Sequence, residues 1–209
     1  MSRAPSFGGI ILAAGESSRM GRDKALLPWP PLDPTQITPK DTFLSAAIRS
    51  LTTSSDFVIV VTGKNESTLA PIAYSSGASV VTNPDPSHGQ FSSLQVGLQE
   101  VLHRGRDAAI VTLVDRPPVA AATVQTLRDA FALAPLDVWA VVPEFSGKHG
   151  HPYVVGRVMI EKFLQAPVNS NAREIEHQFQ EHIQYLGIDD PFVAVNINTP
   201  ADYSALLAK

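Results

Sequence analysis

Small and cationic residues gather in one short stretch near the start of the chain, residues 9–24. An apolar run over residues 9–14 leads directly into Gly15, and Gly21 follows soon after. Small residues let a bulky ligand lie against bare backbone, and exposed N–H groups in such a turn can hold an anion. The side chains of this stretch that could neutralise phosphate oxygens are Arg19, Arg22 and Lys24. A strand, a glycine turn and nearby cations together predict a phosphate-binding loop.

Two common phosphate loops do not fit this stretch. A Walker A loop needs Gly-Lys followed by Ser or Thr, the dinucleotide fingerprint needs the spacing G-x-G-x-x-G, and neither occurs here. An ordinary turn with solvated charges is the alternative for a lone glycine turn. The clustering of glycines, arginines and Lys24 within one loop favours phosphate binding instead.

Other polar side chains follow predicted strands. Asp115 comes directly after the apolar run 108–114, and Asn198 follows the run 193–197. Ligands of α/β proteins bind beyond the carboxyl ends of the strands, so we expect Gly15, Asp115 and Asn198 to meet at one edge of the sheet. On position alone, Asp115 suits either a magnesium ligand or a turn aspartate.

Four further residues are candidates for nucleotide binding. Thr62 and Asn83 stand at the ends of two predicted strands, where they could contact a nucleotide. Gly89 and Ser93 lie near a predicted helix start, which suits either a base contact or helix capping.

The elements that must position these residues can be read from apolar periodicity. Strands are predicted at 9–14, 57–61, 78–82, 108–114, 138–142, 183–188 and 193–197. Helices are predicted from Phe43 (capped by Asp41 or Thr42), at 66–74, from about Phe91, at 120–134, near 156–165, at 171–181, and from the cap Thr199. This alternation predicts a three-layer α/β/α fold with a mostly parallel, mixed sheet.

Five prolines interrupt the chain over residues 28–41, which excludes regular structure there and predicts an insertion. The insertion is either a mobile flap beside the site or a surface loop. Residues 143–152 form a polar, glycine-containing loop. No linker or repeat divides the sequence, so we expect a single domain over residues 1–209.

Composition narrows the classes of function. The 209 residues carry a formal net charge of −4, which gives no sign of a nucleic-acid surface. The absence of cysteine excludes disulfides, thiolate zinc sites and a cysteine nucleophile. The apolar run 9–14 is too short for a signal peptide or a membrane span, so we expect a cytoplasmic protein.

The first loop resembles the signature of a known family. Residues 12–24 read Leu-Ala-Ala-Gly-x-Ser-x-Arg-Met-Gly-x-x-Lys, as in the molybdenum cofactor cytidylyltransferases and guanylyltransferases. These enzymes belong to a wider group that also includes nucleotidyltransferases of sugar phosphates and of isoprenoid precursors. Further segments similar to the family are Asn83-Pro84-Asp85, residues 89–94, Asp115-Arg116-Pro117, Gly150-His151-Pro152 and residues 196–200.

The resemblance implies a Rossmann-like nucleotidyltransferase fold of the glycosyltransferase-A-like type. It also implies roles for individual residues. Arg19 and Lys24 would contact the triphosphate, and Asp115 would bind Mg²⁺, which makes these the three catalytic candidates. The backbone that would flank the base and ribose belongs to Leu12, Ala13, Ala14 and Gly15.

Asn198 stands where many relatives have an aspartate, and asparagine also occurs there in sequences like the guanylyltransferases. It is expected either to ligate or support the metal through its neutral oxygen, or to cap the final helix. The loop that ends in His151 and Pro152 faces the pterin acceptor in the family, so both are acceptor-binding candidates. His149 and His151 could suggest a zinc site, but no cysteine or carboxylate cluster supports one.

We therefore expect a Mg²⁺-dependent nucleotidyltransferase that transfers CMP, or alternatively GMP, to the terminal phosphate of molybdopterin and releases pyrophosphate. Ala14 favours CTP because guanylyltransferases usually carry glycine there, whereas Asn198 favours GTP. The expected partners are a nucleoside triphosphate and a pterin phosphate, with a molybdoenzyme or its chaperone as a further conceivable partner, and neither nucleic acid nor membrane. Two alternatives stay open: a nucleotidyltransferase acting on a sugar phosphate or other small phosphate, and a non-catalytic nucleotide-binding regulatory or chaperone module.

Overall fold

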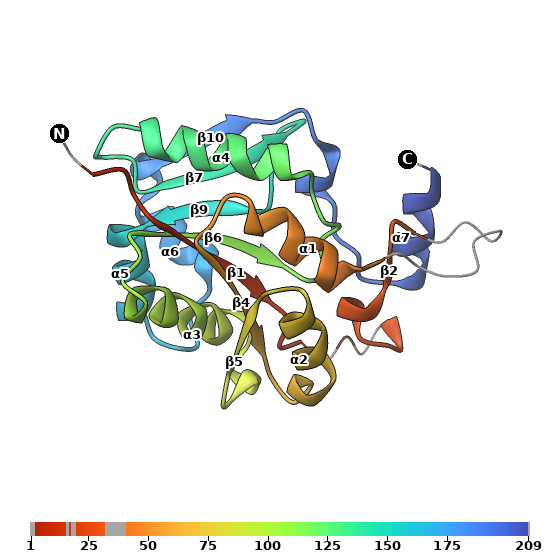
Figure 1. The fold of residues 1–209 in the computed structure, drawn as a ribbon. Helices are drawn as coiled ribbons and strands as arrows, with labels where there is room; N and C mark the ends of the chain where they lie inside the picture. Colours follow the sequence, from red (N-terminus) through yellow and green to blue (C-terminus); the bar gives the residue numbers. More distant parts are fainter. Residues whose placement is uncertain (1–2, 16, 18–19, 32–40, 209) are drawn as a thin grey trace.

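The computed structural model describes residues 3–15, 17, 20–31 and 41–208. Most of the described strands form one sheet in the spatial order β10-β7-β9-β6-β1-β4-β5, with β8 paired to β7 (Figure 1). The strands are β1 (Phe7–Leu12), β4 (Phe57–Thr62), β5 (Ser79–Thr82), β6 (Ala108–Leu113), β7 (Ala140–Phe145), β8 (Lys148–His149), β9 (Tyr153–Gly156) and β10 (Ile183–Gly187). All neighbours from β6 to β5 are parallel, whereas β9 runs antiparallel to both β6 and β7.

Helices cover both faces of this sheet. The helices on one face are α1 (Phe43–Thr52), α2 (Glu66–Ser75) and α4 (Ala121–Leu133), and those on the other are α3 (Gln90–His103), α5 (Arg157–Gln165) and α6 (Ala172–Gln178). The central strands are apolar on both sides because each face meets a helical layer. The predicted three-layer α/β/α fold with a mostly parallel, mixed sheet is thus confirmed.

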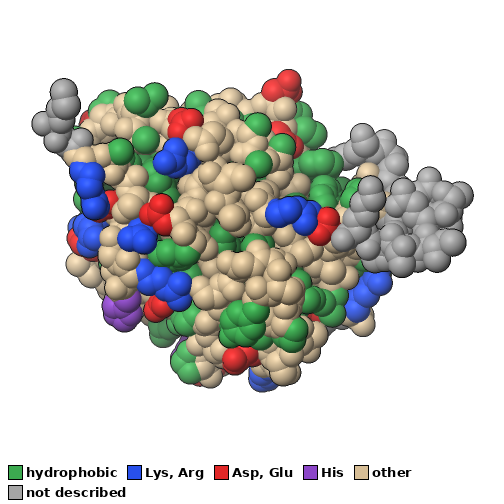
Figure 2. Space-filling model, viewed as in Figure 1, with side chains coloured by type: hydrophobic (Ala, Val, Ile, Leu, Met, Phe, Trp, Pro, Cys, Tyr) green, Lys and Arg blue, Asp and Glu red, His purple; other side chains and the backbone are tan. Residues whose placement is uncertain are grey.

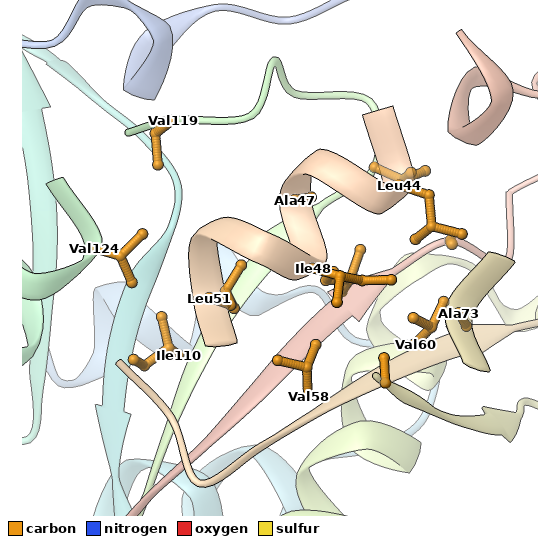
Figure 3. Close-up of a cluster of buried hydrophobic side chains, with 14 of the residues drawn as sticks. Leu44, Ala47, Ile48, Leu51, Val58, Val60, Ala73, Ile110, Val119 and Val124 are labelled. Carbon is orange, nitrogen blue, oxygen red and sulfur yellow. The ribbon is translucent and has the colours of Figure 1, made fainter. Parts of the chain in front are cut away.

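The side chains of the central strands alternate between the two cores. In β4, Val58 and Val60 pack with α1, as Figure 3 shows, whereas Ile59 and Val61 pack beneath α3. Helix α1 contributes Leu44 and Ile48 to the first of these cores, and both are fully buried. Because alternate side chains of a strand must enter opposite cores, a shift by one residue would expose apolar side chains, and the register between strands is fixed. The polar residues that follow the parallel strands are therefore held at the same edge of the sheet.

A third, smaller core brings residues 20–29 and Phe43 together with the C-terminal segment that begins at Ile197. Its buried members are Met20, Leu27, Phe43, Ile197 and Leu206, and Trp29 and Tyr203 pack against it. The Tyr203 hydroxyl also donates to the carbonyl of Pro28, at 2.9 Å. This core fixes the segment after Ile197 against the loop that follows β1.

Helix caps are where the sequence predicts them. The Thr42 side chain caps α1 in a capping box with Ser45, and the Thr199 side chain caps α7 (Pro200–Ser204) in a second one with Asp202. In both boxes each side chain satisfies a backbone N–H group of the other residue.

Two predictions of secondary structure are wrong, and one strand was not predicted. Residues 193–197 are not a strand: Pro191–Ala194 is a 3₁₀ helix capped by Asp190, and the carbonyl of Val193 accepts from the His151 N–H in place of a neighbouring strand. The sequence also gave no sign of β9, which is only four residues long. The prolines of 28–41 do not exclude all pairing, because β2 (Pro28–Trp29) and β3 (Asp41–Thr42) pair at the ends of that segment. Residues 32–40 lie outside the described part.

The face drawn in Figure 2 mixes basic and acidic side chains, which also pair in the structure. Arg49 lies 2.6 Å from Asp41, and the Arg104 guanidinium lies 2.8 Å from Glu100. Among the described residues, no helix has both the length and the apolar character that crossing a bilayer requires.

Candidate active site

Three residues that are far apart in sequence meet beyond the carboxyl ends of the strands. The Lys24 ammonium nitrogen lies 3.6 Å from Asp115 Oδ2 and donates to Asn198 Oδ1 at 3.3 Å. Only 10% of the Lys24 side chain is exposed, so its charge depends on these two partners. The predicted meeting of the first loop, Asp115 and Asn198 at one edge is therefore present in the structure.

Backbone hydrogen bonds hold the three segments in register. Asp115 follows β6, and its carbonyl accepts from the N–H of Ile197 at 2.9 Å. The carboxylate of Asp202 accepts from the N–H groups of Asn198 and Thr199, and these bonds lower the pKa of Asp202. Asn198 is thus placed by an irregular C-terminal segment that packs on the third core, and not by the strand that we predicted.

The first loop is closed by an asparagine that the sequence analysis did not single out. Asn65 Nδ2 donates to the carbonyl of Ala13 at 2.9 Å and to Asp23 Oδ2 at 2.7 Å, and its Oδ1 accepts from the Gly63 N–H. It therefore ties together residues on both sides of the loop. Asn65 stands at the N-cap position of α2, but its side chain makes no capping hydrogen bond. Its sequence position suggests a helix cap and does not indicate the role in the loop.

The part of the loop that precedes Lys24 has an unusual backbone. Gly21 has φ of +72°, a conformation that favours glycine. Arg19 lies outside the described residues, so its predicted contact with the triphosphate stays a prediction. Arg22 is described, and its guanidinium lies 6.0 Å from the centre of the Tyr203 ring.

Three connected hollows open at this edge of the sheet. The central cleft, of about 260 Å³, is lined among others by Gly15, Lys24 and Asp115. The Asp85 cavity, of about 660 Å³, shares Ala14 and Gly15 with it. The Arg116 cavity, of about 590 Å³, shares Leu12, Gly89, Gln90 and Leu113 with the central cleft. A ligand in the central cleft could therefore extend to either side.

The other predicted nucleotide contacts divide into two groups. The residues that line the central cleft are Leu12, Ala14, Gly15, Gly89 and Ser93. Ala13 and Thr62 are buried and line none of the three hollows, whereas Asn83, also buried, lines the Asp85 cavity. Both polar ends of the Asn83 amide are engaged, because Nδ2 donates to Ser92 and Ser93 and Oδ1 accepts from the Asp85 N–H.

Gly89 caps a helix, and its predicted contact with a base stays a prediction. It is the N-cap residue of α3 with φ of +93°, which favours glycine, and it also lines the central cleft. Ser93 Oγ accepts from Asn83 at 2.9 Å and lines the same cleft.

The candidate acceptor residues lie on the Arg116 side. His151 lines the Arg116 cavity, whereas Pro152 is buried behind it. Burial and, to a lesser extent, the charge of Arg116 lower the pKa of His151 to about 3, so its ring is neutral at neutral pH. The His149 ring stacks on Tyr185 with ring centres 3.9 Å apart. The two histidines are thus engaged by different neighbours.

A charged arginine and a carboxyl group in the Arg116 cavity were not assigned roles from the sequence. Arg116 is part of the family-like segment Asp115-Arg116-Pro117, in which only Asp115 has a predicted role. Burial raises the pKa of the Glu176 carboxyl to about 7, although the charge of Arg173 opposes this. Glu174, two positions earlier on α6, is exposed, so helix periodicity alone could have separated the two glutamates.

The oxygen atoms near Lys24 fit a magnesium ion that arrives with a nucleotide. Asp115 Oδ1 is buried and has no hydrogen-bond partner in the described structure, which leaves it available as a ligand. Within the described residues, no cluster of three or more His, Cys, Asp or Glu side chains could hold a metal alone. Magnesium commonly takes only one or two protein oxygens, with the rest from phosphates and water.

Comparison with known proteins agrees with this geometry. The MobA-like NTP transferase domain family matches residues 9–183, which is most of the chain. The chain belongs to this family. It is therefore a nucleotidyltransferase.

Curated relatives of this MobA-like protein cover nearly its whole length. It is 27% identical to the molybdenum cofactor cytidylyltransferase of Escherichia coli, over 93% of this chain and 92% of that protein. It is 26% identical to the probable molybdenum cofactor guanylyltransferase of Rhodopirellula baltica, over 95% of this chain and 90% of that protein.

Solved structures show the same fold. Rv0371c from Mycobacterium tuberculosis superposes with a TM-score of 0.79 and 25% identity, covering 98% of this chain and 99% of that one. A nucleotidyl transferase from Methanothermobacter thermautotroptrophicus has a TM-score of 0.75 and 20% identity, over 97% of this chain and 98% of that one.

Proposed function

We propose that this MobA-like nucleotidyltransferase transfers CMP from CTP to the terminal phosphate of molybdopterin, with Mg²⁺ and with release of pyrophosphate. The observation that carries the proposal is the meeting of Lys24, Asp115 and Asn198 beside a cleft that Lys24 and Asp115 line and that shares wall residues with a second cavity. Curated relatives named as molybdenum cofactor nucleotidyltransferases support the acceptor.

The reaction joins two anions. An oxygen of the acceptor phosphate attacks the α-phosphorus of the nucleotide, the bond from that phosphorus to the bridging oxygen of the β-phosphate breaks, and pyrophosphate leaves. The protein must align the reactants and neutralise their charge. In this proposal, the Lys24 ammonium exchanges its contacts with Asp115 and Asn198 for triphosphate oxygens, and Arg19 adds a second cation.

Asp115 and Asn198 would hold the magnesium ion through side-chain oxygens. When bound, the ion neutralises triphosphate charge and favours one phosphate geometry. Asp115 Oδ1, which lacks a partner in the described structure, is the oxygen best placed to take it. Asn198 contributes a neutral oxygen, so the charge of the site comes mainly from Asp115.

Two of the buried predicted residues support the walls of the hollows, and one of them, Asn83, also lines the Asp85 cavity. Asn83 positions Ser93 through its amide, and Thr62 Oγ1 contacts Thr82 Oγ1 at 3.4 Å beside the Asp85 cavity. We propose that the base and ribose extend toward this cavity, along the backbone of Leu12, Ala13, Ala14 and Gly15. The acceptor would then occupy the Arg116 cavity, near His151.

The preference for CTP rests on Ala14. Ala14 lines both the central cleft and the Asp85 cavity, and a Cβ added at Gly63 would lie 3.4 Å from the Ala14 Cβ. A side chain at this point reduces the room for a base, which favours the smaller pyrimidine. Relatives of both nucleotide classes are similarly distant, so they do not favour either base.

Thermal stabilisation by each of the four triphosphates with Mg²⁺ tests the base choice. We expect CTP to raise Tm most, and we expect Ala14→Gly to increase the response to GTP. A rise in Tm with GTP alone would refute the choice of CTP. Pyrophosphate release with molybdopterin and with a panel of sugar phosphates tests the acceptor, since release with a sugar phosphate alone would exclude molybdopterin.

A further inference from the structure

The Arg116 side chain is a cation with few partners beside the reaction centre. Its Nη1 donates to the carbonyl of Val195 at the long distance of 3.4 Å, and its Nε is buried without any partner in the described structure. Within the same residues, no carboxylate lies within 4.0 Å of this guanidinium. An arginine carries five N–H donors and stays charged in proteins, so most of its binding capacity is unused.

Burial makes this arrangement costly unless an anion completes it. A partly buried charge loses hydration, and only paired or hydrogen-bonded groups regain that energy. The carboxylate of the adjacent Asp115 lies beyond 4.0 Å and offsets only part of the burial cost, which still lowers the pKa of Arg116. The neighbouring His151 is neutral at neutral pH and has a buried, unpartnered Nδ1, so it adds no compensating charge. Arg116 therefore has the features of a binding group that awaits an anionic ligand.

The position of Arg116 indicates which anion. It directly follows Asp115, yet it lines the larger cavity beside the central cleft and is absent from the lining of the cleft itself. Lys24 serves the central cleft, where the triphosphate is proposed to bind. The second anion of the proposed reaction is the acceptor phosphate, which must approach the α-phosphorus from the side opposite the leaving pyrophosphate.

We propose that the Arg116 guanidinium binds the terminal phosphate of the acceptor and holds it beside the nucleotide. The inference rests on the proposed function, since the acceptor must be a phosphate ester. Two parallel N–H donors of an arginine can hold two phosphate oxygens, which fixes the direction of the third. Part of the cavity wall is apolar and aromatic, with Phe91, Leu94, Val142 and Tyr153, and suits one face of a flat heterocycle. The rest of the wall is polar and includes Arg173 and Glu176, which could contact the polar edge of such a ring.

Kinetics of Arg116→Gln separate this role from nucleotide binding. With CTP and molybdopterin, we expect KM for the acceptor to rise roughly 10- to 100-fold, the effect of losing a charge-assisted hydrogen bond, and KM for CTP to stay within about twofold. Arg157→Gln is a matched control, because Arg157 also donates to a backbone carbonyl but lines none of the three hollows. An unchanged KM for the acceptor, or an equal rise for both substrates, overturns the inference.

A binding experiment removes the dependence on turnover. Affinity is measured for 6-hydroxymethylpterin and its phosphate ester, each with a non-hydrolysable CTP analogue bound. The wild type should prefer the ester, Arg116→Gln should lose that preference, and Arg116→Lys should keep part of it. A wild type without the preference, or a Gln variant that keeps it, overturns the inference. A wild type that binds the ester through Arg116 but transfers no nucleotide to molybdopterin overturns only the proposed function.

Discussion

Replacing Glu176 with glutamine should make the protein more stable above neutral pH. Burial raises the pKa of this carboxyl from 4.5 to about 7 in the folded state. The folded state therefore holds the proton more tightly than the unfolded chain, so wild-type stability is highest below pH 4.5 and falls as the pH rises through about 7. Glutamine resembles the protonated form at every pH and removes this loss.

The size of the effect follows from the shift. A displacement of one pKa unit corresponds to about 1.4 kcal/mol, so the full shift would cost the wild type about 3 kcal/mol. Because Glu176 lines an open cavity, solvent screening reduces this value, and we expect Glu176→Gln to gain about 1–3 kcal/mol in the free energy of unfolding at pH 8.5. At pH 5, just above the unfolded pKa, the difference should be only about a quarter as large.

Urea unfolding at several pH values from 5 to 8.5 measures this difference. Other ionisable groups line the same cavity, and they remain in both proteins: His88, Arg116, His149, His151, Tyr153, Arg173, His177 and Tyr185. Burial raises the pKa of Tyr153 above its usual value, so it does not titrate in this range. Glu174→Gln, at an exposed position of the same helix, is the matched control for the substitution itself. A constant difference between Glu176→Gln and the wild type from pH 5 to 8.5 would refute the reasoning.

Three further predictions follow from the geometry of the site. Asp115→Asn should abolish pyrophosphate release but keep stabilisation by CTP in a thermal melt; full activity would exclude the proposed role. Gly150→Ala should lower the free energy of unfolding by about 3 kcal/mol, because its Cβ would lie 1.9 Å from the carbonyl oxygen of Val193, whereas Gly187→Ala meets no atom within 4 Å and serves as the control. Asn198→Asp should lower the Mg²⁺ concentration that gives half-maximal activity, since it adds a charged ligand; an unchanged Mg²⁺ dependence would place residue 198 outside the metal site.

The sheet could be predicted because its central strands are buried on both faces. Residues 57–61 and 108–114 form continuous apolar runs, and the structure places them beside β1. The ends of such a strand are harder to predict than its presence. The first strand was predicted at residues 9–14, whereas β1 spans Phe7–Leu12. Antiparallel β9 was not predicted, because a strand of four residues is too short to show a clear periodicity of apolar residues.

The site was partly predictable for a different reason. Lys24 and Asp115 belong to local motifs, and the rule that ligands bind beyond parallel strand ends brings them together. The position of Asn198 depends instead on Ile197 packing in the third core, a contact with residues far away in the sequence. Asn65 acts through tertiary surroundings that no local pattern encodes, whereas helix periodicity could have placed Glu176 on the inner face of α6 but not beside Arg116.

A crystal structure with a non-hydrolysable CTP analogue and Mg²⁺ tests the central claim most directly. The account predicts triphosphate oxygens within hydrogen-bond distance of the Lys24 ammonium, with the Asp115 carboxylate on the metal of the same nucleotide. A triphosphate bound away from both Lys24 and Asp115 would contradict it.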